Sequence, residues 1–419
     1  MAKLWIRCLG LVSSLALLAT AAHAAPAGNA LFSPVDAVEL QGKALNLDTS
    51  YQALAQDPAS ASLLVVRANP DAVSEAAESI TLNLGAGLDL RAHRVEARRA
   101  DAGILVWSGV LEYTGDARVP FSRQALQFDP INSVLLVNNG GRITGNVHYN
   151  GEWYKIRPLN SGDHAIVAVD FSAMPPDHPA EYGQLRTIRM PNRPASLTKA
   201  DTVIRVMVNY TPAAAAASGD INGLITLAVA EANLGYDNSG VLIDIILANK
   251  SQTTYTESGS FSTDLSRYRS TTDTYMTAIH TTRNSSTADV AVLLINNASS
   301  CGLASGIGST ASTAFAVAHW DCATGYYSFA HEIGHLQSAR HDPATDSSTS
   351  PYTYGHGYRY TGSPSWRTIM AYNCPNGCPR LNYWSNPAKL FNGVPMGTAA
   401  QNDNARVLNN TRGTVAAFR

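Results

Sequence analysis

The chain has 419 residues, of which 45% are hydrophobic and 15% are charged. This length favours two domains, and the composition is that of a globular protein. The formal net charge of -2 gives no reason to expect nucleic acid or an anionic membrane as a partner.

The first residues have the pattern of a signal peptide. Lys3 and Arg7 precede an apolar run, and small residues follow up to Ala24. We therefore expect residues 1–24 to be removed after Ala24 and the protein to be secreted, by a bacterium. A membrane anchor is the alternative, but the run is shorter than the roughly 20 residues a span needs. No membrane partner is expected.

Residues 25–185 read as a small antiparallel β domain. The stretch "SITLNLGAGLDLRAHRVEARR" alternates apolar and polar residues, and hairpin signals follow at residues 139–141 and 150–151. The stretch "RTIRMPNRPASLTKA" (186–200) contains two prolines and four basic residues. It is expected to be an exposed linker that proteases cut.

From residue 201 the pattern changes to alternating strands and helices. Strands are predicted in "DTVIRVMVNYT", "VLIDIILANKSQTTYTE" and "ADVAVLLIN", the last central and buried. Helices are predicted in "DINGLITLAVAEANLGYDNSG", closing at Gly235, and in "TDLSRYRSTTDTYMTAIHTTRN". This order implies a mixed sheet with helices, followed by one more helix and a loop-rich tail.

That last helix carries a metal-site pattern, "HEIGHLQSARHD". His331 and His335 are four residues apart, so on a helix they share a face and can ligate one ion. Glu332 is rotated away from that face, where it can reach a water on the metal as general base. His341 can return as third ligand only if the helix stops near Ser338 and the chain turns back.

Further along the chain, Asp342 can support the third ligand, and "RTIMAYN" places Met370 in a tight apolar segment. Together these residues resemble the metzincin superfamily, with its extended zinc motif and methionine turn. The flanking "GLASGIGSTASTAFAVAHWDCATGYYSFAHEIGH" and "NCPNGCPRLNYWSNP" are similar to secreted reprolysin-like proteases of the peptidyl-Asp metalloendopeptidase type. The resemblance covers roughly residues 200–419.

The resemblance implies one catalytic Zn²⁺ held by His331, His335 and His341, with Glu332 as general base and Met370 beneath the metal. Tyr372 matches a tyrosine that serves as extra ligand or oxyanion donor. The implied fold is an α/β metzincin-like catalytic domain, 201–419, with a twisted mixed sheet, long helices and a loop-rich C-terminal subdomain. The expected activity is that of a zinc metalloendopeptidase acting on protein or peptide substrates.

One residue departs from the family pattern. The family has glycine at this position, because the turn favours a left-handed conformation, whereas this chain has Ser338. We expect a left-handed serine at a cost of about 1–2 kcal/mol, which a folded domain can absorb.

Specificity and substrate binding have weaker sequence signals. The resemblance implies a preference for substrates with an acidic residue after the cleaved bond. If this chain shares that preference, Arg367 and Arg380 are candidates to bind the acidic side chain, although either could be a surface arginine. An extended substrate is expected to add to an edge strand in "GIGSTASTAFAVAH". Ca²⁺ is a further candidate near Asp342, Asp346 or Asp237, without an EF-hand or repeat motif to support it.

Four cysteines follow the leader, namely Cys301, Cys322, Cys374 and Cys378. In an exported chain they predict two disulfides, and of three possible pairings proximity favours Cys301–Cys322 and Cys374–Cys378. A zinc site built from all four is the alternative.

The β-rich half is expected to be a propeptide that inhibits the protease, which would then be a zymogen and a monomer. Residues 25–300 contain no cysteine, so another group must cover the zinc. Asp177 and His178 in "PPDHP" are candidates, and a permanent accessory domain is the alternative. A secreted zinc-binding adhesin or toxin component without proteolytic activity remains the alternative function.

Overall fold

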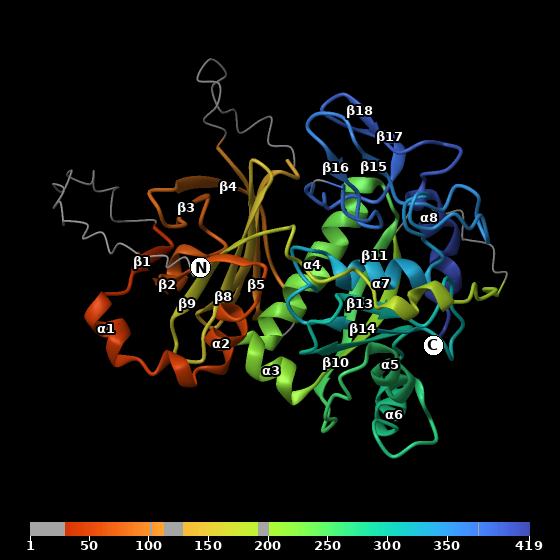
Figure 1. Cartoon of the computed structure of the whole chain (residues 1–419), viewed down its shortest axis with the longest axis horizontal. Helices are drawn as coiled ribbons and strands as arrows, with labels where there is room; N and C mark the ends of the chain where they lie inside the picture. The colour runs from red at the N-terminus through yellow and green to blue at the C-terminus, as the bar shows by residue number, and fades with distance from the viewer. Residues whose placement is uncertain (1–29, 101–102, 113–128, 192–200, 376) are drawn as a thin grey trace, which may run out of the picture.

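The structure, a computed structural model, describes residues 30–100, 103–112, 129–191, 201–375 and 377–419. The predicted signal peptide therefore lies outside the described residues, as do residues 192–200 of the predicted linker. Figure 1 shows two parts, an N-terminal sheet and a C-terminal α/β part, with α4 (Ile221–Ser239) between them.

The N-terminal part is built on one antiparallel sheet of nine strands, in the order β1-β2-β9-β8-β7-β6-β5-β4-β3. Tight turns at Gly140-Gly141 and Asn150-Gly151 connect β6 to β7 and β7 to β8, as the sequence predicts, and all four residues have positive φ. The strands are β1 Phe32–Pro34, β2 Ser60–Ala68, β3 Ser79–Asn83, β4 Asp89–Arg99, β5 Leu105–Leu111, β6 Asn132–Asn139, β7 Arg142–Tyr149, β8 Glu152–Pro158 and β9 His164–Val169. Two short helices, α1 Ala37–Gly42 and α2 Thr49–Ala55, precede β2.

The C-terminal part contains a mixed five-stranded sheet in the order β11-β10-β12-β14-β13. Four strands run parallel, and β13 alone runs antiparallel to its neighbour β14. The strands are β10 Thr202–Tyr210, β11 Ile243–Gln252, β12 Val290–Ile295, β13 Gly302–Ala304 and β14 Phe315–His319. β12 is central and wholly buried, as its continuous apolar sequence predicts.

The helices of this part differ from the prediction in two places. α4 continues past Gly235 to Ser239 and ends at Gly240, whose φ of 69° supplies the left-handed cap. The second predicted helix is broken into α5 (Phe261–Arg269) and α6 (Ala278–Ser285). Ser270 accepts hydrogen bonds from the amides of Thr272 and Asp273, so it competes with the helical pattern between them.

The remaining elements surround the site. They are α3 Pro212–Ser218, α7 Ser328–Leu336, the short strands β15 Arg359–Tyr360, β16 Trp366–Arg367, β17 Asn386–Phe391 and β18 Val394–Met396, and α8 Asn404–Val415. The predicted loop-rich tail thus ends in a helix. No single helix among the described residues is long and apolar enough to cross a membrane; α3 and α4 pass together only as a pair bent by 86°.

One hydrophobic core joins the two parts. Val65, Leu159 and Val167 from the N-terminal sheet belong to the same buried cluster as Leu224 and Ile225 of α4. A charged group is buried at the same contact: the Lys155 ammonium lies 2.5 Å from a carboxylate oxygen of Asp321, and Arg157 Nε lies 3.5 Å from the other. The N-terminal sheet therefore packs directly against the C-terminal part.

Candidate metal centre

Helix α7 presents the metal-site pattern from the middle of the fold. Phe329, Ile333 and Leu336 are buried in the main hydrophobic core, which fixes the face that the helix turns inward. His331 and His335 lie one turn apart on another face, and both are buried. The packing of the apolar side therefore orients the two imidazoles.

The helix ends where the ligand spacing requires it to end. α7 stops at Leu336, and Ser338 has a φ of 76°, so the predicted left-handed serine is confirmed. The Ser338 and Ala339 amides donate to the carbonyls of His335 and Gly334, which closes the turn. This reversal carries His341 back toward the helix.

Four histidines converge on one point, and one of them comes from the N-terminal part. His178 Nε2 lies 3.0 Å from that of His331, 3.2 Å from that of His335 and 2.9 Å from that of His341. The Nε2 atom of His341 is 3.2 Å from that of His331 and 3.0 Å from that of His335. This is the one group of three or more possible metal-ligating side chains found among the described residues.

The hydrogen bonds of these imidazoles show that a cation fits the point between them. The Nδ1 atoms of His178, His331 and His335 lie 2.8–2.9 Å from the backbone carbonyls of Gly302, Ile369 and Ala339. A carbonyl only accepts, so each Nδ1 carries the proton and each Nε2 presents a lone pair. Lone pairs that face one another at about 3 Å repel unless an ion lies between them.

The spacing suits zinc in particular. Zn–N bonds of about 2.0–2.1 Å in a tetrahedron place the nitrogens roughly 3.3 Å apart. The site also keeps the imidazoles neutral, because burial lowers the pKa of His331, His335 and His341 well below the ordinary value and the neighbouring histidines lower it further. Neutral imidazole is the form that binds a metal.

The segment after the helix supports the third histidine. Asp342 accepts hydrogen bonds from the Tyr372 amide at 3.0 Å and from Arg359 at 2.8 Å. His356 Nδ1 lies 2.7 Å from the His341 carbonyl, so this buried histidine helps to hold His341 in place. These contacts tie the returning chain to the segment that follows Met370.

Met370 and Tyr372 take different positions around the group. Met370 is fully buried against α7, and a Cβ added at Gly334 would lie 3.1 Å from its sulfur. The Tyr372 ring lies 4.5 Å from the His341 ring and 6.2 Å from that of His178, between ring centroids. Burial raises the pKa of Tyr372, so its phenol keeps its proton.

Glu332 lies beside the four histidines and is completely buried. Its Oε1 is 3.6 Å from Nδ1 of His178. Burial raises the pKa of Glu332 well above its ordinary value and the Asp177 carboxylate raises it further, whereas Arg380 lowers it. A carboxyl group with a raised pKa is suited to accept a proton and return it near neutral pH.

Arg367 and Arg380 are not surface residues, because 0% and 2% of their area is exposed. Both guanidinium groups face Asp177, at 2.7 Å from Arg380 and 3.6 Å from Arg367. Tyr326 lies against both, with its ring centroid 4.2 Å from the Arg380 guanidinium and 5.2 Å from that of Arg367. The two candidate specificity residues therefore share one buried carboxylate.

Two contributors escaped the sequence analysis. The Tyr182 ring stacks on His178 and packs against His341, both at 4.4 Å between centroids, so it covers the group. Tyr326 forms the floor between the arginines. Neither is marked by a motif, because Tyr182 reaches His341, and Tyr326 reaches Arg367 and Arg380, only through contacts that are remote in sequence.

The edge strand also lies elsewhere than predicted. Phe315–His319 is β14, which has β12 on one side and β13 on the other. The edge is β13, Gly302–Ala304, only three residues in a small-residue stretch that lacks strand periodicity. Its outer side contacts residues 176–177, through hydrogen bonds from the amides of Cys301 and Gly302 to the carbonyls of Pro176 and Asp177.

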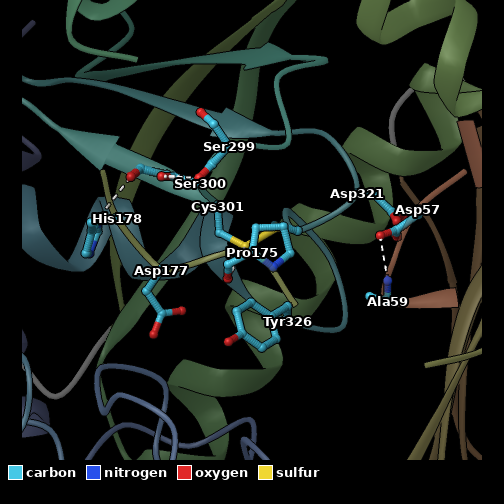
Figure 2. The surroundings of a disulfide bond; sticks show 12 residues. Asp57, Ala59, Pro175, Asp177, His178, Ser299, Ser300, Cys301, Asp321 and Tyr326 are labelled. Carbon is cyan, nitrogen blue, oxygen red and sulfur yellow. Dashed lines mark hydrogen bonds between the residues drawn. A yellow bond between two sulfur atoms is a disulfide. The ribbon is translucent and has the colours of Figure 1, made fainter. Parts of the chain in front are cut away.

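The cysteines form the two disulfides that proximity favours, Cys301–Cys322 and Cys374–Cys378. This pairing excludes a zinc site built from the four thiolates. Figure 2 shows the first disulfide beside Pro175, with Asp177 and His178 directing their side chains to different places. The bond anchors β13 to the segment before α7.

The aspartates considered for calcium have other partners. Asp342 binds Arg359, and Asp346 binds Arg340 at 2.7 Å. Asp237 lies near Asp201 and Asp244, and no ligand cluster is found there in the described part of the chain.

Comparison with known proteins agrees with this geometry. A model of metallo-peptidase family M12, Reprolysin_5, matches residues 200–385. Peptidyl-Asp metalloendopeptidase of Stenotrophomonas maltophilia strain R551-3 is 51% identical over 418 residues, 98% of this chain and 97% of the relative. The enzyme of the same name from Xanthomonas campestris pv. campestris is 49% identical over 406 residues, 95% of this chain and 96% of its own length.

A shorter relative, the peptidyl-Asp metalloendopeptidase of Pseudomonas fragi, is 53% identical over 189 residues, which make up 45% of this chain and all of the relative. With the two relatives that match almost the whole chain and the M12 match, these identities establish the family. The chain belongs to the peptidyl-Asp metalloendopeptidase family and is a metalloendopeptidase with a site suited to zinc.

Proposed function

We propose that this protein is a secreted zinc metalloendopeptidase that hydrolyses the peptide bond preceding an acidic residue. The observation that carries the proposal is the position of two buried arginines, Arg367 and Arg380, on one carboxylate next to the histidine group. The names of the relatives, which refer to peptidyl-Asp bonds, agree with such a preference.

His331, His335 and His341 are the residues proposed to hold zinc during catalysis. Bound there, zinc supplies a Lewis acid that polarises the substrate carbonyl and makes a water molecule more acidic. Glu332 accepts a proton from the attacking water and then donates it to the leaving amine. The burial of Glu332 favours both steps, because its raised pKa brings its proton affinity closer to those of the attacking water and the leaving amine.

The acidic side chain of the substrate is proposed to bind between Arg367 and Arg380. Both arginines are held before substrate arrives: Arg367 donates to the Ala371 carbonyl at 2.9 Å, and Arg380 donates to the Tyr326 carbonyl at 2.9 Å. A fixed pair of guanidinium groups favours a carboxylate strongly over an apolar side chain, which would leave two buried charges unpaired.

Tyr372 and β13 complete the proposed substrate site. The Tyr372 phenol is protonated and lies beside His341, so it can donate a hydrogen bond to the oxyanion. The amides of Cys301 and Gly302 on the outer side of β13 can bind an extended substrate by strand addition.

The N-terminal part is proposed to act as a propeptide of a secreted, monomeric zymogen. The proposed organisation is a signal peptide at 1–24, a propeptide at 25–185, a linker with the activation cut at 186–200, and the protease at 201–419. Support comes from His178 and Asp177, which lie at the candidate site while belonging to the N-terminal part.

Replacement of the general base tests the proposal. Glu332→Gln keeps the size of the side chain, so the variant is expected to retain zinc by atomic absorption and to lose hydrolysis of an Asp-containing fluorogenic peptide. Glu257→Gln, which alters a carboxylate that binds Thr211 and the Asn296 amide, is the control and is expected to stay active. Hydrolysis by Glu332→Gln at the normal rate would disprove the role of Glu332.

A further inference from the structure

We propose that residues 175–182 are an internal pseudosubstrate that closes the site at two points. The His178 imidazole is the fourth metal ligand, and the Asp177 carboxylate occupies the pocket that accepts the acidic residue of a substrate. This inference rests on the proposed function, because it assigns the inhibitory segment to the zinc and specificity sites of the same enzyme.

His178 meets the requirements of a ligand. Its Nε2 lies 2.9–3.2 Å from the other three Nε2 atoms, about as close as His341 lies to His331 and His335, and its Nδ1 is fixed by the Gly302 carbonyl. Carbonyl-bound Nδ1 is the arrangement seen for His331 and His335 as well. Four such imidazoles make a closed tetrahedral set, which leaves no position for a catalytic water.

Asp177 satisfies the two buried arginines. Its carboxylate is 5% exposed, and its oxygens lie 2.7 Å from Arg380 and 3.6 Å from Arg367. No other acidic side chain in the described chain forms an ion pair with either arginine.

The backbone explains why the segment is not cut. In a substrate cleaved before Asp177, the attacked carbonyl would be that of Pro176. Here that carbonyl accepts a hydrogen bond from the Cys301 amide at 2.8 Å, and His178 takes the place of the water. The Oε1 atom of Glu332 lies 3.6 Å from Nδ1 of His178.

The segment continues along the site beyond these two points. Tyr182 covers His178 and His341, and the amides of Ile188 and Ile307 donate to the carbonyls of Ile307 and Arg186. Thr187 pairs with Ile307 in parallel, and Met190 reaches the Ser338 turn. A cut within 192–200 would therefore leave His178 at the metal site and Asp177 at the arginines. Activation then requires the N-terminal part to dissociate as well.

The test uses the full chain in a Glu332→Gln background, so that all variants stay intact. The chain is loaded with Co²⁺, and its visible absorption is recorded while acetohydroxamate is added. A closed four-histidine set is expected to give no spectral change. In His178→Ala the hydroxamate reaches the metal, so a spectral change is expected at concentrations at least tenfold below the highest at which the parent shows none.

Asp177→Asn isolates the second point. The substitution removes the charge that the two arginines bind. Loss of a charged hydrogen bond is expected to weaken the binding of the segment to the site roughly tenfold or more. Hydroxamate should therefore change the spectrum of this variant, but at higher concentrations than it needs with His178→Ala. Asp170→Asn, which lies just before this segment, is exposed and accepts hydrogen bonds from Ser172, is the matched control and should behave as the parent.

Three results would overturn the inference: a hydroxamate response of the parent, no response of His178→Ala, or equal behaviour of Asp177→Asn and Asp170→Asn. X-ray absorption of the unsubstituted, zinc-loaded chain gives a check that needs no variant. Four imidazoles are expected, and three with an oxygen ligand would contradict the inference.

Failure of the inference is distinguishable from failure of the proposed function. His335→Ala is expected to weaken cobalt binding strongly. If it does not, the proposed zinc site is wrong. If it does and only His178→Ala is silent, the zinc site stands and the pseudosubstrate is refuted.

Discussion

Replacing Ser338 with glycine should stabilise the protein, because the serine has a φ of 76°. A left-handed conformation costs a residue with a Cβ about 1–2 kcal/mol, and glycine avoids this cost. Glycine also makes the unfolded chain more flexible, which costs about 0.4–1 kcal/mol. The Ser338 hydroxyl has one weak contact, with the Met190 sulfur at 3.3 Å, so little else is lost.

The net expectation for Ser338→Gly is a gain of about 0.5–1 kcal/mol, or a thermal midpoint about 0.5–1 °C higher. The measurement is calorimetry of the full chain in the Glu332→Gln background, which prevents self-digestion. Ser266→Gly in helix α5 is the control, and it should destabilise because glycine is the poorer helix former. A lower midpoint for Ser338→Gly would refute the argument from backbone conformation.

Three further changes test other parts of the site. Arg380→Ala should lower kcat/KM for an Asp-containing peptide roughly 10- to 100-fold relative to an Asn-containing one, whereas Arg406→Ala should leave the ratio unchanged. Tyr372→Phe should keep zinc, by atomic absorption, and lower kcat roughly 100-fold. Burial acts to raise the pKa of Asp321, but Lys155 and Arg157 outweigh it, and the pKa falls from 3.8 to about 2. This stabilisation is present above pH 3.8 and is lost as the pH falls toward 2. Lys155→Met should cost roughly 3 kcal/mol at neutral pH in urea unfolding, with a smaller further loss in acid. A preference unchanged by Arg380→Ala, a kcat unchanged by Tyr372→Phe, or an acid loss unchanged by Lys155→Met would each contradict the corresponding assignment.

The parts of the site that could be predicted from sequence are those with local geometry. The spacing of His331 and His335 on a helix, and the need for a reversal before His341, place the end of the helix near Ser338, and the resemblance, which implies glycine there, supplies the left-handed conformation. The disulfide Cys374–Cys378 follows in the same way from its short loop. In each case the relevant distances are set within about ten residues.

The parts that could not be predicted depend on long-range packing. Asp177 and His178 are candidates from the sequence, but their different partners are not predictable, because His178 meets His331 and Asp177 meets Arg380 only through long-range contacts. Arg367 and Arg380 are buried by Tyr326 and Asp177, so composition alone leaves them looking like surface residues. Helix α8, "NARVLNNTRGTV", is largely polar and contains a glycine, and it is held by tertiary packing rather than by propensity.

The central claim is a zinc-dependent peptidase that cuts before acidic residues. The most direct measurement is the digestion of casein by the activated protein, with and without a zinc chelator, read by sequencing of the cleavage sites. The account predicts cuts mainly before Asp, with Glu as a weaker second, all lost with the chelator and restored by zinc. Cuts mainly before large apolar residues, or cleavage that the chelator leaves unchanged, would contradict it.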